Sequence, residues 1–231
     1  MEKLKISDLL DYKFLSGIVA SPSGKKAAFP AKQANKEKNS YDSWAYIADF
    51  CTGEVRKLTS FGAESHLLFD SEDTLLFSSV RKHEDKAKDG KEKTVFYRLS
   101  LKGGEAERAF EIPYSVNDMK KMADGSYVFS ATVDLNKPED EDGLKEYQDY
   151  HIIEELPYWE NGAYFVSRFR NTLFTYQEEE GVCERVTAPL FAVSGFELSG
   201  ETIVYTGVSY DQVLPMYNAM YGYDCRTKTT T

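Results

Sequence analysis

One pattern recurs four times along this chain of 231 residues: a short apolar strand, a tight turn and a second apolar strand. The turns fall at Pro22-Ser23-Gly24, Glu72-Asp73, Asp124-Gly125 and Ser199-Gly200. Proline presets φ, and glycine and aspartate tolerate unusual backbone angles, so each copy predicts a β-hairpin. A recurrence at about 40–50 residues is typical of repeat folds, and it constrains the fold more than any single motif does.

A second hairpin follows each copy of the first. Its leading strands are predicted at residues 43–49, 95–99, 172–176 and 219–224. Two hairpins in a constant order make a four-stranded antiparallel sheet, which is the blade of a β-propeller. A generic meander of short strands is the alternative, but it would not repeat the same two hairpins. We therefore predict an all-β fold, a β-propeller portion with about four four-stranded antiparallel blades.

The repeat divides the chain into a lead-in helix at residues 1–14 and a partial propeller at residues 15–231. Within the second part, the blades are expected at about 15–60, 65–112, 115–188 and 192–231. A propeller closes with four to eight blades, and the last strand of the fourth blade has barely begun here. We therefore expect this chain to be part of a longer protein.

Longer polar loops are predicted between the second and third strands of each blade. They cover residues 31–42, 81–93, 131–163 and 208–217. In a radial blade such loops share one face, where rigid folds place their binding contacts. The loop at 81–93 mixes both signs of charge, which favours a solvated excursion over an interaction tail.

The insertion at 131–163 is the longest of these loops and has a distinct composition. It begins with an acidic run at residues 138–142, and a short helix is expected near residues 143–155. Its later aromatic residues are Tyr147, Tyr150, Tyr158 and Trp159. Aromatic side chains bury a large area at small entropic cost, which suits a docking surface for another domain or an entering peptide. The alternative is that Leu156, Tyr158 and Trp159 fill the gap between adjacent blades.

No segment of the sequence has the pattern of a catalytic or metal site. The Gly-x-Ser-x-Gly nucleophile elbow is missing, as are Cys-x-x-Cys and His-Glu-x-x-His. Asp140, Asp142 and Gly143 resemble part of an EF-hand loop, but Pro138 would occupy its first ligand position. We therefore predict no catalytic residue, no metal ligand and no cofactor in this chain.

Two pairs of charged residues are candidates for binding a substrate. Glu154 and Glu155 could pair on a substrate amine, although a solvated helix face is the simpler explanation. Arg168 and Arg170 could hold a carboxylate, although alternate residues on one strand face commonly form cross-strand ion pairs. The sequence leaves both explanations of each pair open.

Charge and composition limit the partners. A formal net charge of −10 and a pI near 4.9 argue against a nucleic acid or an anionic membrane as partner. The charged start of the chain is unlike a signal peptide, and no apolar run is long enough for a membrane helix. Three widely spaced cysteines, Cys51, Cys183 and Cys225, suit reduced thiols. We expect a cytoplasmic protein, and a homo-oligomer is left open.

Several motifs resemble the S9 prolyl-oligopeptidase family, and most closely its acylaminoacyl-peptidase or dipeptidyl-peptidase-like branch. The turn at residues 21–24 is similar to the family's "SPDG" turn, and residues 56–59 are similar to the "R-x-L-T" that ends its blades. Residues 156–164 and 170–174 resemble its "lpyr-x-DG-x-Gy" and "R-x-HLF" segments. The departures from these segments are Asn161, where the family has Asp, and Thr172, where it has His.

The resemblance implies a complete ring of seven or eight blades, followed by a C-terminal α/β-hydrolase domain that carries the catalytic Ser, Asp and His. None of those three residues has a counterpart in this sequence. The chain would then be the non-catalytic N-terminal propeller part of a serine peptidase, and it would gate peptide access to the hydrolase domain. Its partners would be that domain of the parent chain and a peptide substrate. The alternative is a stand-alone propeller that serves as a binding scaffold, TolB-like or WD-type.

Overall fold

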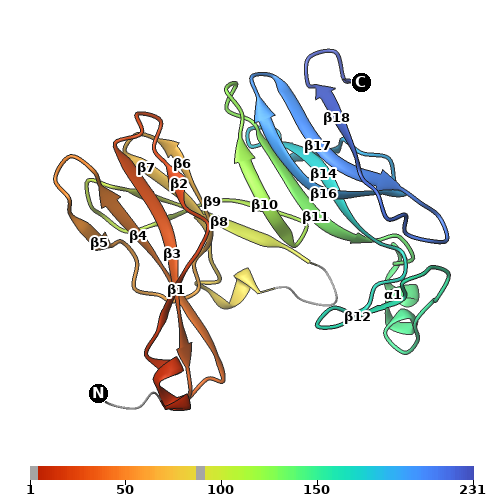
Figure 1. Cartoon of the computed structure of the whole chain (residues 1–231), viewed down its shortest axis with the longest axis horizontal. Helices are drawn as coiled ribbons and strands as arrows, with labels where there is room; N and C mark the ends of the chain where they lie inside the picture. The colour runs from red at the N-terminus through yellow and green to blue at the C-terminus, as the bar shows by residue number, and fades with distance from the viewer. Residues whose placement is uncertain (1–4, 87–91) are drawn as a thin grey trace. The chain divides into compact units, whose positions relative to one another are not determined.

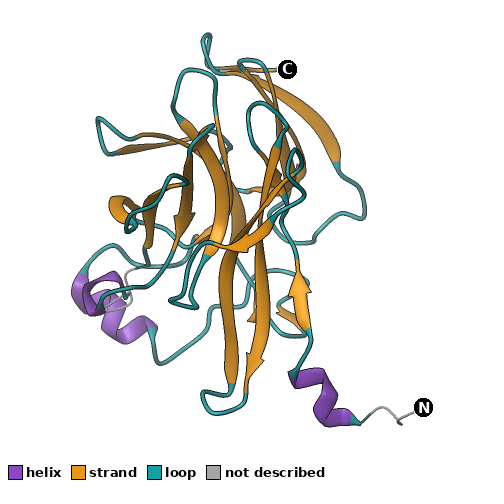
Figure 2. Cartoon of the chain, turned by 90° about the vertical axis from the view of Figure 1, so that its left-hand side faces the viewer, coloured by secondary structure: helices purple, strands orange, loops and turns teal. Residues whose placement is uncertain are grey.

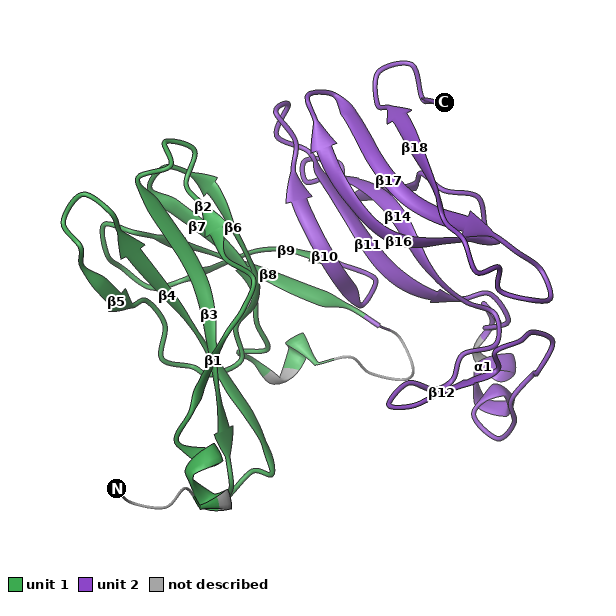
Figure 3. Cartoon of the chain, viewed as in Figure 1, with its two compact units in different colours: residues 1–87, 93–111 green, residues 88–92, 112–231 purple. Residues whose placement is uncertain are grey.

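The computed structural model describes residues 5–86 and 92–231, and β-strands make up about half of that part of the chain (Figure 2). The strands fall into two compact units, one of residues 1–87 and 93–111 and the other of residues 88–92 and 112–231 (Figure 3). Each unit contains two large antiparallel sheets. Within the described residues, no helix has both the length and the apolar character needed to cross a membrane.

The first unit contains the sheets formed by the first two copies of the repeat (Figure 1). Strand order is β1-β3-β4-β5 in the first sheet, with β2 also paired to β3, and β6-β7-β8-β9 in the second. The strands are β1 (Lys13–Leu15), β2 (Val19–Ala20), β3 (Lys26–Asn35), β4 (Ser40–Asp49), β5 (Val55–Lys57), β6 (Ser65–Ser71), β7 (Thr74–Ser78), β8 (Thr94–Ser100) and β9 (Glu107–Ile112).

The first strand of the first sheet is interrupted where it passes Pro30. β1 ends opposite Ala31 and β2 begins opposite Ala28, so three residues of the incoming chain face two residues of β3. Pro30 has no N–H to donate to a neighbouring strand. Gly17 lies against the proline ring with a φ of +57°, a conformation that glycine adopts without strain. The result is a bulge that divides one strand into β1 and β2.

The two sheets of the first unit share a core that combines small and large side chains. Ala28 and Ala45 of the first sheet are fully buried in one cluster with Leu75 and Phe77 of β7 and Val95 of β8. Small residues on one sheet leave room for the large side chains of the facing sheet, which is how stacked sheets reach the packing density of a protein interior.

The second unit contains the third and fourth sheets and a small two-stranded sheet. Strand order is β10-β11-β14-β15 in the third sheet and β16-β17-β18-β19 in the fourth, and β12 pairs with β13. The strands are β10 (Val116–Lys121), β11 (Tyr127–Asp134), β12 (Trp159–Glu160), β13 (Tyr164–Phe165), β14 (Phe169–Gln177), β15 (Val182–Arg185), β16 (Phe191–Ser199), β17 (Thr202–Ser209), β18 (Ala219–Asp224) and β19 (Thr229–Thr230).

The core of the second unit joins its two large sheets. Val128 and Leu173 of the third sheet are fully buried in one cluster with Phe191, Ile203 and Tyr205 of the fourth. The rings of Phe191 and Tyr205 meet edge to face, with centroids 5.5 Å apart. Such ring pairs contribute more to stability than the apolar area they bury. This cluster therefore helps to fix how the two sheets of the unit pack.

The predicted all-β fold of four-stranded antiparallel blades is confirmed. Each of the four large sheets contains the doubled hairpin expected from the sequence, and β11 pairs with β14 across the segment that carries the small β12–β13 sheet. The turn glycines take the conformation that was the reason for predicting turns: φ is +69° at Gly24, +94° at Gly125 and +62° at Gly200.

Two expected segments differ in the structure. The polar stretch at 31–42 is not a loop, because β3 runs to Asn35, β4 starts at Ser40, and only residues 36–39 form the turn. An exposed hairpin can be polar on both faces, which explains why its strands were not recognised. In the segment predicted as a lead-in helix, the described residues form a short 3-10 helix, η1 (Ile6–Leu10), and then β1. Residues 1–4, and residues 87–91 of the loop at 81–93, lie outside the described residues.

Candidate functional site

The longest connection in the described part of the chain joins β11 to β14, and we call residues 135–168 the insertion. It contains one helix, α1 (Glu141–Tyr147), and the small β12–β13 hairpin. Asp140 starts the helix by accepting a hydrogen bond from the N–H of Gly143 at 2.8 Å. At the other end, the hydroxyl of Tyr147 donates to Asp134 at 2.7 Å. The expected helix at 143–155 is therefore shorter and earlier, because the β-branched pair Ile152-Ile153 and then Pro157 favour extended chain.

The structure brings all four candidate residues, Glu154, Glu155, Arg168 and Arg170, into one network of charges. Arg170 of β14 is fully buried and forms a two-point pair with the carboxylate of Glu155, which is also buried. Nη1 lies 3.0 Å from Oε2, and Nη2 donates to Oε1. The other N–H groups donate to the carbonyls of Phe169, Leu190 and Tyr210 at 3.0–3.3 Å. The Tyr210 ring lies 3.7 Å from the guanidinium carbon.

Arg168 forms the exposed side of the same network. Its Nε donates to Glu154 at 3.0 Å, its Nη1 donates to Asp211 at 2.6 Å, and its backbone N–H donates to Glu155 at 2.9 Å. The hydrogen bond to Asp211, followed by the one to Glu154, raises the pKa of the Arg168 guanidinium. The carboxylates of Glu154 and Asp211 are about half or more exposed, so this side of the network meets solvent.

The network has a structural half and an exposed half. The donors of Arg170 are taken up by Glu155 and by backbone carbonyls, so this pair ties the insertion to β14 and to the chain near Tyr210. Of the two glutamates, Glu155 is buried against Arg170, and Glu154 reaches solvent. Binding of a substrate by Glu154, Glu155, Arg168 and Arg170 stays a prediction. Asp211 and Tyr210 belong to the network, and nothing in their local sequence pointed to it.

The insertion also pairs with the β17–β18 loop of the same unit. The N–H of Leu156 donates to the carbonyl of Gln212 at 2.8 Å, and the N–H of Leu214 donates to the carbonyl of Leu156 at 2.9 Å. Large apolar side chains on both segments stay exposed, and we call them the insertion surface. They are Tyr150, Ile153, Leu156, Tyr158, Trp159, Tyr164, Val213, Leu214, Met216 and Tyr217.

The exposure of these rings decides between the two explanations of the aromatic insertion. Tyr150, Tyr158 and Trp159 are 44–47% exposed. They therefore do not fill a gap between blades in this chain. Large apolar side chains that stay exposed on paired segments commonly mark a contact with a partner.

The first unit has its own buried charge network, which the sequence did not reveal. The carboxylate of Glu64 is fully buried and accepts hydrogen bonds from Arg81 at 3.1 Å and from the N–H of Gly62 at 3.0 Å. Asp85 accepts from the hydroxyl of Tyr97 at 2.6 Å and from the N–H of Arg81 at 2.9 Å. Burial opposes the charge on Asp85, but these hydrogen bonds outweigh it and lower its pKa.

This network makes the first unit sensitive to alkaline pH. Burial, followed by the hydrogen bond to Asp85, raises the pKa of Tyr97 to about 12. Because the folded-state pKa lies above the unfolded value near 10, the contribution of Tyr97 is complete below about pH 10 and is lost as the pH rises toward 12. We expect the stability advantage of the wild type over Tyr97→Phe, measured by urea unfolding, to shrink across that interval. The same substitution at the exposed Tyr12 is the matched control. An advantage that stays constant to pH 12 would contradict the assignment.

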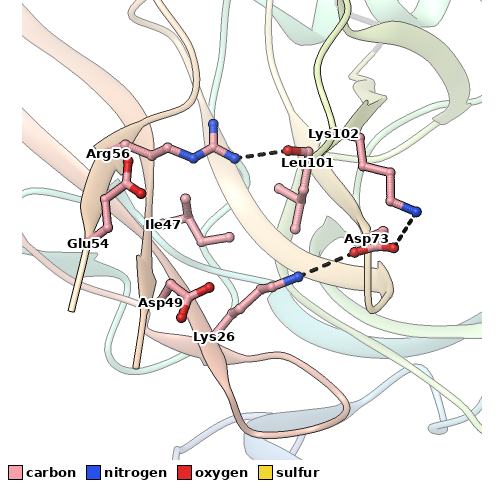
Figure 4. A pocket seen from close by; sticks show the side chains of 8 residues that line it. All are labelled: Lys26, Ile47, Asp49, Glu54, Arg56, Asp73, Leu101 and Lys102. Atoms are coloured by element: carbon pink, nitrogen blue, oxygen red, sulfur yellow. Dashed lines mark hydrogen bonds and ion pairs between the residues drawn. The ribbon is translucent and has the colours of Figure 1, made fainter. Parts of the chain in front are cut away.

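A small groove of about 170 Å³ lies between the two sheets of the first unit (Figure 4). Three of its charged residues form ion pairs, since Lys26 and Lys102 both contact Asp73, at 3.3 and 2.7 Å. Arg56 donates to the carbonyl of Leu101 at 2.9 Å. The hydrogen bonds from Lys102 and Lys26 lower the pKa of Asp73. These contacts link neighbouring blades, so we assign the groove a structural role. Among the described residues, no group of His, Cys, Asp and Glu is placed to hold a metal ion.

No family model and no curated protein matches this sequence. Among solved structures, the acylaminoacyl peptidase of Pyrococcus horikoshii matches 93% of the chain, with 17% identity and a TM-score of 0.68. The β-propeller domain of the trilobed protease of Pyrococcus furiosus matches 91%, with 20% identity and a TM-score of 0.50. A TolB-type protein of Agrobacterium tumefaciens matches 92%, with 10% identity and a TM-score of 0.51.

These similarities define the class of fold: the chain consists of β-propeller blades. The resemblance expected from the sequence motifs is confirmed at that level, since the blades are similar to those of acylaminoacyl peptidase. The chain spans about a third of the acylaminoacyl peptidase, 32% of its length, and 62% of the TolB-type protein.

Proposed function

We propose that this chain is the non-catalytic N-terminal propeller part of an S9-type serine peptidase. In that role it covers the active site of an α/β-hydrolase domain of the parent chain and restricts which peptides reach it. The observation that carries the proposal is the insertion surface, where apolar side chains from two loops of one unit remain exposed. The blade motifs and the similarity to acylaminoacyl peptidase over 93% of the chain support the same role.

The physical argument rests on what the exposed side chains cost. Each large apolar side chain left in water forgoes about 1.5–3 kcal/mol relative to full burial. Met216 is fully exposed and Tyr217 is 70% exposed, and both lie on the loop that pairs with the insertion through Leu156. A second domain that covered this surface would recover that free energy. The exposed carboxylates of Glu154 and Asp211 would then lie at the polar rim of the contact.

A stand-alone propeller scaffold is the second candidate. The similarity to the TolB-type protein favours it, because the chain spans 62% of that protein against 32% of the acylaminoacyl peptidase. The scaffold would use the same insertion surface to hold a separate protein. The two candidates differ in whether a hydrolase domain is encoded on the same polypeptide.

The isolated chain should hydrolyse neither acyl-peptide nor dipeptidyl substrates. Its sequence has no Gly-x-Ser-x-Gly elbow to present a serine nucleophile. The measurement is the release of a chromophore from such substrates by the pure chain, with and without a serine-directed inhibitor. Turnover that the inhibitor abolishes would contradict the assignment of a non-catalytic role.

The gating role is tested in the full-length protein, whose gene should encode a Gly-x-Ser-x-Gly element on the same reading frame. Replacing both Met216 and Tyr217 with Ser weakens the insertion surface without touching a buried group. We expect the ratio of kcat/KM for long peptides to that for short peptides to rise severalfold, because the gate no longer closes. The matched control replaces Phe50 and Val55, two exposed apolar residues of the first unit, with Ser. An unchanged ratio, or no hydrolase element in the gene, would overturn the proposal.

A further inference from the structure

An aromatic pocket of about 460 Å³ lies within the insertion, bounded on one side by the start of β14. Six rings line it: Tyr147, His151, Trp159, Tyr164, Phe165 and Phe169. The volume is in the range of small-ligand sites. None of the charged pairs of the Arg170 network lines it, so the pocket is a separate feature of the insertion.

The rings are held in fixed relative orientations. Trp159 of β12 meets Phe165 of β13 edge to face, with centroids 5.2 Å apart, and meets Tyr164 in the same way at 5.4 Å. The ring of His151 stacks on the ring of Phe165, with centroids 4.0 Å apart. Because the β12–β13 hairpin aligns Trp159 opposite Phe165, the arrangement follows from strand pairing.

The acidic residue in the described lining of the pocket is Asp134, at the end of β11. Its Oδ2 accepts from the hydroxyl of Tyr147 at 2.7 Å, and its Oδ1 accepts from the N–H of Asn136 at 3.0 Å. Each oxygen can accept a further hydrogen bond. Of the described residues that line the pocket, none is a lysine or an arginine. The site therefore suits a cation and opposes an anion.

The surrounding sequence strengthens this electrostatic preference. Residues 135–168 contain nine acidic and three basic residues, a net charge of −6, whereas the whole chain carries −10. A segment of about one seventh of the length thus holds more than half of the net charge. Such a concentration raises the local density of cations and speeds their association.

We infer that this pocket binds the side chain of a lysine or an arginine in a peptide. The faces of aromatic rings attract ammonium and guanidinium groups, the alkyl stem packs between the rings, and Asp134 meets the charged end. An uncharged apolar side chain would pack against the same rings but would bring no cation to the carboxylate of Asp134. The inference names the substrate class of the proposed function and rests on that function for the statement that the ligand is a peptide substrate.

The test titrates the pure chain with two capped tripeptides, acetyl-Gly-Lys-Gly-amide and its norleucine counterpart. Norleucine keeps the alkyl stem and removes the ammonium. The chain has two tryptophans, whose indole N–H groups give separate NMR signals. The signal of Trp159 reports on the pocket, and that of Trp44, in the first unit, serves as the internal control. We expect the lysine peptide to shift the Trp159 signal and to bind about tenfold or more tightly than the norleucine peptide. Equal affinity of the two peptides, or no shift of the Trp159 signal, would overturn the inference.

Two variants separate the pocket from the general negative charge. Asp134→Asn should weaken binding of the lysine peptide by about tenfold. Asp142→Asn removes the same charge from α1, outside the pocket, and should change the affinity by less than twofold. Tyr164→Ala removes a ring whose residue is 65% exposed. It therefore tests the contribution of the aromatic rings to peptide binding with little risk to the fold. Equal effects of Asp134→Asn and Asp142→Asn would show that charge alone attracts the peptide.

The outcome also separates this inference from the proposed function. Peptide binding is measured on this chain alone and does not require a hydrolase domain. If the chain binds the lysine peptide but its gene encodes no hydrolase element, the pocket inference stands and the proposed peptidase role is wrong. If the gate variants act as expected but the Trp159 signal does not respond to the peptide, the proposed role stands and the pocket inference is wrong.

Discussion

Replacing Arg170 with methionine should lower the free energy of unfolding of the second unit by about 3–5 kcal/mol. The guanidinium is fully buried, and it is the two-point partner of the buried carboxylate of Glu155. Without it, the buried carboxylate of Glu155 would keep the backbone N–H of Arg168 at 2.9 Å and the longer ion pair with the Nη1 of Arg168 at 3.6 Å. The carbonyls of Leu190 and Tyr210 would lose a donor as well. Urea unfolding monitored by circular dichroism measures the change.

Two controls test whether the cost arises from the unpaired charge. The double variant Arg170→Met with Glu155→Met removes both charges, and it should recover much of the stability because replacing a whole buried pair with apolar residues is often neutral. Lys145→Met breaks an ion pair whose two side chains are 74% and 92% exposed, and it should cost less than about 0.5 kcal/mol. If Arg170→Met costs no more than Lys145→Met, the pair does not hold the insertion in place.

The repeat in the sequence was sufficient to predict the blades because turn chemistry is local. Gly24, Gly125 and Gly200 adopt positive φ for reasons contained in a few neighbouring residues. The insertion was harder to predict. Asp140 marks the start of α1, but the pairing of Leu156 with the chain at 212–214 joins segments more than fifty residues apart. No local pattern contains that information.

The candidate site shows the same limit. Glu155 and Arg170 were recognised as charged residues in the right segments, but their burial depends on tertiary packing that a sequence does not display. Asp211 and Tyr210 complete the network from another blade, and each resembles an ordinary loop residue. The change from acidic to aromatic residues in the insertion indicated an aromatic surface, but it did not predict a pocket. Its assembly depends on the β12–β13 hairpin, which places Trp159 opposite Phe165.

Gly207→Ala should destabilise the fourth sheet by about 3 kcal/mol, the upper part of the range for overpacking. Gly207 lies in β17, opposite Val193, where a bulge follows in β16. A Cβ at this position would lie 2.2 Å from the carbonyl oxygen of Ala192 and 2.5 Å from the ring of Phe191. The backbone oxygen cannot yield as a flexible side chain could, and Phe191 is part of the buried core. Glycine here permits a close approach of two backbones.

The matched control is Gly222→Ala in β18, the neighbouring strand of the same sheet. Its Cβ would lie 3.4 Å from the Oγ1 of Thr231 and 3.6 Å from the Cγ2 of Thr202, and both can be accommodated by small side-chain movements. Because the two substitutions add the same methyl group to adjacent strands, their difference in urea midpoint isolates the steric term from any change in strand propensity. Gly207 lies a few residues before the segment at 212–214 that pairs with the insertion. We therefore expect Gly207→Ala also to weaken binding of the lysine peptide, whereas Gly222→Ala should leave that binding unchanged. Equal stability of the two variants would mean that β16 moves away from Gly207 at little cost, and the bulge would then not fix the position of this edge of the sheet.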